Sequence, residues 1–119
     1  IMDSTHWVEP RNPKSQQFMK VLEKENVDLT WEVILQYSGV QLIADAVERA
    51  RSGHPAEVGG APGGSTFEDH IMPYGPTKFV NGQNEGAQPI NTQVQKMAIQ
   101  TIFPERFASA KPIFPVPAR

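Results

Sequence analysis

The chain has 119 residues, a formal net charge of -2 at pH 7 and no cysteine. This length suits one domain, which would bury about two-thirds of its unfolded surface. The absence of cysteine excludes a disulfide framework and thiolate metal sites. The net charge argues against binding to nucleic acid or anionic lipid, and no apolar run reaches the roughly 18 residues needed to span a bilayer.

The first predicted helix is short and amphipathic. Asn12 is a favourable N-cap, and Pro13 suits the first helical position because an N–H there would have no partner within the helix. Phe18 and Leu22 then recur at helical spacing, up to about Asn26. The pattern predicts a helix with a single apolar face.

The second predicted helix is longer and more apolar. Thr30 is its expected N-cap, and Glu32 places a negative charge in the first turn, where it complements the helix dipole. The helix is predicted to run to about Arg51, with Gly53 as its stop signal. Because residues 31–37 are apolar around most of the circumference, this helix needs more cover than the first helix provides.

A Gly- and Pro-rich break, residues 54–66, separates the helical part, residues 1–53, from strands and a Pro-rich tail, residues 67–119. Residues 53–64 hold five glycines and two prolines, so we predict no helix there, and residues 59–65 have the composition of a flexible linker. The last 24 residues, 96–119, are predicted to be a solvated tail.

The third part of the chain predicts a small antiparallel strand set. Pro76 to Val80 is expected to be an edge strand, since Pro76 cannot donate to a ladder, and Asn81-Gly82 is typical of a tight hairpin turn. Two further strands are indicated by two alternating series: Ile90, Thr92 and Val94, then Met97, Ile99, Thr101 and Phe103. Residues 95–97 offer no standard turn, which predicts a wide turn or a continuous strand.

Residues suited to catalysis are few. His6, His54 and His70 lie in three predicted loops without regular spacing or an accompanying nucleophile, and we expect them to be exposed. Glu68 and Asp69 are expected to be solvated rather than to bind a cation. The glycines are followed by neither a helix start nor a lysine, which disfavours a phosphate-binding loop. The sequence therefore predicts no enzymatic activity, no metal and no organic cofactor.

Several motifs between Tyr74 and Pro117 form a recognisable set: Gly-Pro-x-x-Phe, Asn-Gly-Gln-Asn, and a Pro-rich end after a Phe-Pro step. This run resembles the carboxyl end of type I periplasmic solute-binding proteins, the Leu/Ile/Val-binding receptors that feed ABC importers. With the tyrosine of the second helix, Tyr37, the resemblance covers most of the chain. It departs from the family in the Gly-rich break, where family members place a short helix.

The resemblance implies an α/β fold: the carboxyl-terminal part of a type I periplasmic-binding-protein fold, incomplete as a lobe. The chain is then expected to be a fragment that self-associates or stays with the rest of a cleaved protein. The implied function is capture of a small organic solute, with a branched-chain amino acid or a related compound expected, in the periplasm or outside the cell. ABC permease subunits would recognise the loaded receptor.

The resemblance also suggests where a ligand would touch this chain. Family members often carry an aromatic residue at the start of the second helix, which makes Trp31 the first candidate, followed by Glu32 and Tyr37. Each has a structural explanation as well: Trp31 as a packing anchor, Glu32 as a partner of the helix dipole and Tyr37 as a core residue. Trp7 is expected at a crossing between lobes, in a hinge or packing role.

Two other functions stay open. Related bilobal modules act as ligand sensors in signalling or regulatory proteins, and the reading frame upstream of Ile1 would distinguish a signal peptide from an output domain. The second of these is a small independent interaction domain with a helical hairpin. Cooperative unfolding of the isolated monomer would identify it.

Overall fold

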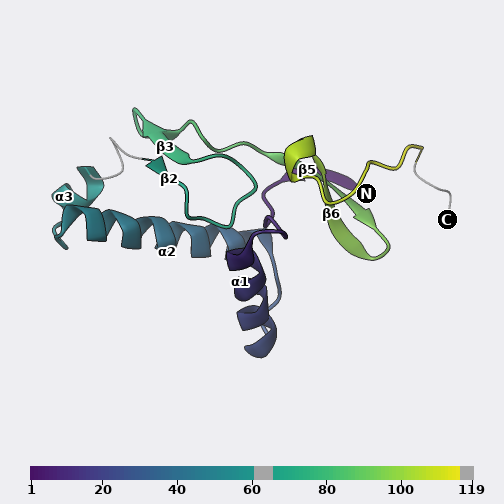
Figure 1. Cartoon of the computed structure of the whole chain (residues 1–119), viewed down its shortest axis with the longest axis horizontal. Coiled ribbons are helices and arrows are strands. Elements are labelled where there is room, and N and C mark those ends of the chain that lie inside the picture. The colour runs from purple at the N-terminus through teal and green to yellow at the C-terminus, as the bar shows by residue number, and fades with distance from the viewer. Residues whose placement is uncertain (61–65, 116–119) are drawn as a thin grey trace.

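The computed structural model describes residues 1–60 and 66–115 of the chain. Within these residues the fold is mixed α/β, with three α-helices and two small antiparallel sheets, as the predicted α/β class requires. The long helix α2 runs along the molecule, and α1 projects from the end where α2 begins (Figure 1). One sheet lies beside the C-terminal half of α2, and the other lies beyond its first residues.

Helix α1 spans Pro13–Lys24 and confirms the first predicted helix. The side-chain oxygen of Asn12 accepts a hydrogen bond from the backbone N–H of Lys14 at 2.9 Å, which satisfies one of the unpaired donors of the first turn. The helix ends before Asn26, whose φ of 54° lies in the left-handed region that terminates helices.

Helix α2 spans Trp31–Ala50 and confirms the second predicted helix. The Thr30 hydroxyl accepts a hydrogen bond from the N–H of Val33 at 3.4 Å, as expected of an N-cap. The predicted stop at Gly53 is wrong, because Arg51 itself adopts the left-handed conformation, with φ 50°. A glycine is favoured at such a position but not required.

The predicted break contains a short helix, α3, over Pro55–Gly60, so the expectation of no helix there is wrong for its first half. Pro55 suits the first helical position. The backbone carbonyl of His54 accepts two N–H hydrogen bonds, both at 3.0 Å, and these close one helical turn. The rest of the predicted linker, residues 61–65, lies outside the described residues.

The part predicted as helical begins with a strand that the sequence does not indicate. Strand β1, Met2–Thr5, pairs antiparallel with β5, Ile90–Gln95, and β5 pairs with β6, Ala98–Phe103, in the order β1-β5-β6. The polar run in β1 has no apolar alternation, and it becomes a strand because β5 offers it a ladder of hydrogen bonds. The two ends of the chain therefore share one sheet.

Strands β5 and β6 form a hairpin with a two-residue turn, because Gln95 pairs with Ala98. The prediction of a wide turn or a continuous strand is therefore wrong. Lys96 and Met97 occupy the turn with φ of 50° and 65°, values that glycine or asparagine usually provide. The Met97 side chain is 97% exposed, so it gains nothing from packing.

The second sheet has the order β2-β3-β4, with β2 at Thr66–Phe67, β3 at Thr77–Val80 and β4 at Gln83–Asn84. The predicted hairpin is confirmed: Asn81 and Gly82 form the turn between β3 and β4 with φ of 48° and 78°. The prediction of an edge strand is wrong, because β3 is central. Its proline, Pro76, precedes the strand and so removes no ladder donor.

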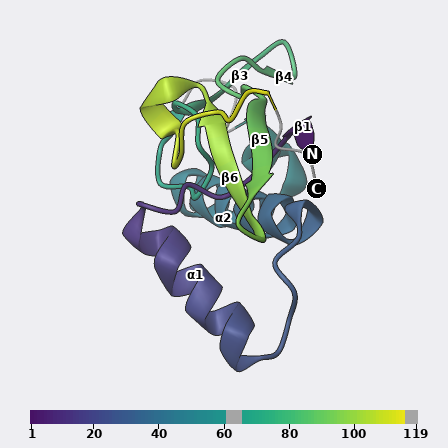
Figure 2. The ribbon, with the colours of Figure 1, turned by 90° about the vertical axis from the view of Figure 1, so that its right-hand side faces the viewer.

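The hydrophobic core lies where α1, the start of α2 and the loop before β3 meet. Phe18 of α1 stacks on Tyr37 of α2 with ring centroids 4.2 Å apart. The buried members of this cluster are Val8, Phe18, Leu22, Ile34, Ile71 and Met72. The lower half of α1 extends away from the rest of the molecule (Figure 2).

A charged pair joins the N-terminal segment to the far end of the chain. The buried Glu9 carboxylate accepts a hydrogen bond from the Arg11 guanidinium at 2.9 Å, and Arg11 also donates to the carbonyl of Arg106 at 2.6 Å. Arg106 belongs to a 3-10 turn over Glu105–Phe107 that follows β6. The hydrogen bond to Glu9 raises the pKa of Arg11 above its ordinary value.

The molecule is elongated for its size, with a radius of gyration of 16.4 Å and extents of 56 × 34 × 20 Å. A compact domain of this length would have a radius of about 13.5 Å. The accessible surface of 8298 Å² also exceeds the roughly 6,400 Å² expected of a compact monomer of 13.2 kDa. The chain therefore exposes surface that a compact domain would bury.

Candidate functional site

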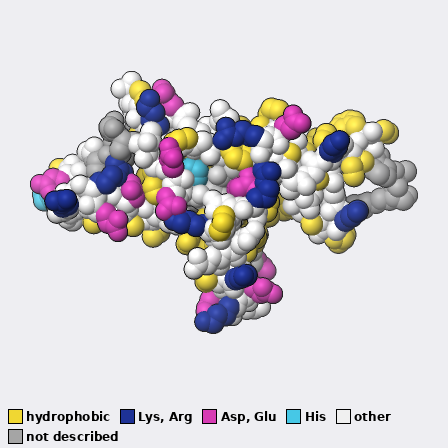
Figure 3. All heavy atoms as spheres, viewed as in Figure 1, with side chains coloured by type: hydrophobic (Ala, Val, Ile, Leu, Met, Phe, Trp, Pro, Cys, Tyr) yellow, Lys and Arg dark blue, Asp and Glu magenta, His cyan; other side chains and the backbone are white. Residues whose placement is uncertain are grey.

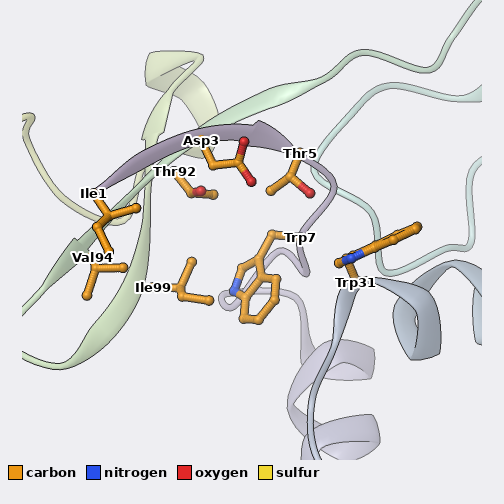
Figure 4. A pocket seen from close by; sticks show the side chains of 8 residues that line it. All are labelled: Ile1, Asp3, Thr5, Trp7, Trp31, Thr92, Val94 and Ile99. Atoms are coloured by element: carbon orange, nitrogen blue, oxygen red, sulfur yellow. The ribbon is translucent and has the colours of Figure 1, made fainter.

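A cavity of about 220 Å³ lies between the β1-β5-β6 sheet and the first residue of α2 (Figure 4). Its lining is mainly apolar, and it includes both tryptophans of the chain. The lining residues are Ile1, Asp3, Thr5, Trp7, Trp31, Thr92, Val94 and Ile99.

Strand geometry explains why these residues share a cavity. Side chains alternate between the two faces of a strand, so every second residue from Ile1 through Trp7 faces the same side. The register continues this face across the sheet, because Asp3 lies opposite Thr92 of β5. Val94 in turn lies opposite Ile99 of β6. The sheet thus presents one continuous wall to the cavity.

The two indole rings provide most of the remaining wall. Trp31 is held at the start of α2 by the Thr30 cap, and it is 48% exposed. Trp7 follows β1 and packs partly against the hydrophobic core. In the close-up view Trp7 lies between Ile99 and Trp31 (Figure 4). A tryptophan exposed beside a cavity is suited to cover an apolar ligand surface while its N–H seeks a hydrogen bond.

The polar groups of the cavity gather on one side. Asp3, Thr5 and Thr92 lie together in the close-up, on the side away from the indole of Trp7 (Figure 4). The Asp3 carboxylate accepts a hydrogen bond from the N–H of Ser4 at 2.8 Å, which orients it. The cavity therefore combines an aromatic and aliphatic wall with a negative charge and two hydroxyl groups.

The opposite face of the same sheet is covered by the Pro-rich tail. Gln93 is buried on that face, its side-chain amide donates to the carbonyl of Ile113, and its side-chain oxygen accepts from the Ile113 N–H, both at 3.0 Å. Gln95 donates to the carbonyl of Lys111 at 2.9 Å. Residues 111–113 are exposed, as predicted for a solvated tail, although two backbone groups of Ile113 and one of Lys111 are bonded to the sheet. This cover leaves the cavity face as the open side of the sheet.

The structure separates the three predicted ligand-contacting residues. Trp31 lines the cavity, whereas Glu32 is exposed in the first turn of α2 and is not among the lining residues. Tyr37 packs on Phe18, which is the core role that the sequence also allowed. Sequence reasoning did not connect Asp3 with Thr92, although the alternation from Ile1 to Trp7 was available as a signal.

His70 is a buried structural residue, so the expectation of an exposed side chain is wrong; it is 5% exposed. Its Nδ1 accepts from the N–H of Met72 at 3.2 Å, and its Nε2 lies 3.0 Å from the carbonyl of Gly75. These partners assign a neutral ring with the proton on Nε2. Burial lowers the pKa of His70 below its ordinary value of 6.5. The ring also packs against Tyr74, with centroids 4.7 Å apart.

The other histidines differ from His70 and from each other: His54 is exposed and His6 is partly buried. In the described ranges, 1–60 and 66–115, no group of three or more His, Asp or Glu side chains is placed to hold a metal ion. Over the same ranges, every helix is too short or too polar to cross a bilayer. No known protein family matches the chain, and no significant match to a curated protein was found.

Proposed function

We propose that this chain is part of an extracytoplasmic solute-binding receptor. The receptor captures a small organic solute, a branched-chain amino acid or a related compound, and delivers it to the permease of an ABC importer. The observation that supports this best is the exposed Trp31 beside a cavity at the start of α2. Type I receptors, which the C-terminal motifs resemble, often use an aromatic residue at that point.

The chemistry of the cavity suits such a solute. An aliphatic side chain would pack against the indole of Trp31 and the Val94 and Ile99 side chains, since burial of apolar surface favours binding. An ammonium group would pair with the Asp3 carboxylate. The volume of about 220 Å³ is below the roughly 300 to 1,000 Å³ of drug-sized pockets, which favours a small solute.

The proposed role is capture without chemical conversion, so the protein turns over no substrate. A second lobe closes over the bound solute and supplies the contacts that this chain lacks. The short helix α3 also supports the resemblance, because it lies where the receptor family places a short helix. The elongated shape is what a piece of a larger bilobal protein would have, since part of its surface would contact the remainder.

Titration of the complete receptor with leucine, isoleucine and valine, followed by indole fluorescence, tests the proposal. Both tryptophans line the cavity, so binding is expected to change their emission in a saturable way, and glucose is the control solute. The variant Tyr37→Phe is a matched control, because it keeps the ring that stacks on Phe18 and should leave the titration unchanged. No saturable change with any of the three amino acids would contradict the proposal.

A further inference from the structure

Helix α2 exposes an apolar stripe on the side away from the core. Val40 and Ile43 are 66% and 60% exposed, and Val47 continues the series one turn later. Residues three or four apart lie on one face of a helix, so these three side chains form a continuous ridge. Hydrophobic side chains gather along the lower margin of the molecule, where α2 runs (Figure 3).

Charged residues of opposite sign bracket this ridge. Glu32 lies in the first turn of α2 and Arg51 at its C-cap, and both are exposed. Helical spacing places Glu32 on the face of the ridge, and Arg51, the C-cap residue, follows Val47 by four residues at the other end of α2. The series is Glu32, Gln36, Val40, Ile43, Val47 and Arg51. Its spacing is the same when it is counted from either end.

We propose that this face of α2 binds a second copy of the chain, with the two α2 helices antiparallel about a twofold axis. Reversal of the symmetric series places Val40 opposite Ile43 of the second copy. Glu32 then lies opposite Arg51 of the second copy, and the symmetry makes this ion pair twice. A parallel pair would place like charges together at both ends, so the charges select the antiparallel arrangement.

The local surface permits close approach of a second helix. Gly39 lies one turn before Ile43, and a Cβ atom built on it would meet no atom within 4 Å apart from its chain neighbours and the adjacent backbone of α2. The 8298 Å² of accessible surface exceeds that of a compact monomer by roughly 1,900 Å². A standard interface takes about 800 Å² from each partner, which is smaller than this excess. This assembly does not depend on the solute-binding proposal.

Analytical ultracentrifugation of the 119-residue chain over a wide concentration range tests the assembly. A monomer–dimer equilibrium is expected, and Ile43→Asp should shift it to monomer. Glu32→Arg and Arg51→Glu should each raise the dimer dissociation constant by roughly tenfold, since two exposed ion pairs become two repulsions. The double variant Glu32→Arg/Arg51→Glu should restore the original constant, because the pairs re-form with the signs exchanged.

The control variant is Glu57→Arg, which makes the same charge change at an exposed site on α3, outside the ridge, and should leave the dimer unchanged. Circular dichroism melts establish that each charge variant folds, so the test does not depend on Ile43→Asp. A chain that is monomeric at every concentration would overturn the proposal. A dissociation constant that stays the same in both single charge reversals would overturn it equally. So would a double variant whose dissociation constant does not return to the original value.

Discussion

Gln93 and Ile113 bind each other through two hydrogen bonds of 3.0 Å, one in each direction. The side-chain amide of Gln93 thus pairs with the backbone of Ile113 as a neighbouring strand would. This pairing holds the Pro-rich segment against one face of the β1-β5-β6 sheet. It leaves the other face, with Trp7 and Asp3, to form the cavity wall.

Removal of this amide should release the tail. Gln93→Ala leaves the backbone groups of Ile113 without their partners, and the expected loss of stability is about 1 to 3 kcal/mol. Hydrogen exchange should show faster exchange of the Ile113 amide, whereas Gln83→Ala at an exposed position of β4 should leave it unchanged. Unaltered protection of Ile113 in Gln93→Ala would contradict the assigned contact.

Stability should fall in mild acid because of His70. Burial lowers the pKa of His70 in the fold, so the unfolded chain binds more protons below pH 6.5. The contribution of the neutral ring is therefore present above that pH and is lost as the pH falls towards the folded pKa. Nearby Asp69 and Glu68 oppose this shift without reversing it.

Urea unfolding at pH values on both sides of 6.5 measures the effect of His70. His70→Gln removes the titrating group and should flatten the pH dependence of the unfolding free energy in this range. His54→Gln alters an exposed histidine and should preserve that dependence. Identical slopes for the His70→Gln variant and the parent chain would show that His70 does not control the acid response.

The two helix caps should differ in importance. Thr30→Ala should cost about 1 kcal/mol, the usual value for loss of an N-cap. Asn12→Ala should cost more, because Asn12 caps α1 and also donates to the carbonyl of His70 at 3.0 Å. Denaturant midpoints of the two variants give the comparison, and an equal or reversed order would be inconsistent with the second contact.

The hairpin turn between β5 and β6 should accept glycine at Met97. The φ of 65° is unfavourable for a residue with a Cβ atom, and the exposed side chain offers no packing to lose. Met97→Gly should therefore stabilise the chain by up to about 1 kcal/mol. Met97→Ala keeps the Cβ atom and should change little. Thermal melts that rank the alanine variant at or above the glycine variant would refute the strained turn.

Local signals made much of the fold predictable. The N-caps Asn12 and Thr30 predicted where α1 and α2 begin, and Asn81-Gly82 predicted the turn of one hairpin. Each of these signals acts within a few residues. Strand β1 could not be predicted, since its pairing partner β5 lies far away in the chain. The Lys96-Met97 turn was missed for a different reason: neither residue favours positive φ.

The site was only partly visible in the sequence. Trp31 stood out as an aromatic residue at a helix start, but the residues around it come from both ends of the chain. Asp3 joins Thr92 only through the pairing of β1 with β5, which no local pattern indicates. His70 was missed as a core residue because its burial depends on bonds to Met72 and Gly75 in an irregular loop.

The cavity beside Trp31 as a small-solute site is the central claim, and one variant tests it most directly. Calorimetric titration of the complete receptor with leucine should show binding weakened by roughly 1 to 3 kcal/mol in Trp31→Ala, the range for loss of a well-packed aromatic contact. Urea melts of the same variant should show a smaller loss of stability than the about 3 to 5 kcal/mol typical of a core tryptophan. Unchanged leucine affinity combined with a large loss of stability would assign Trp31 to packing and contradict the proposed site.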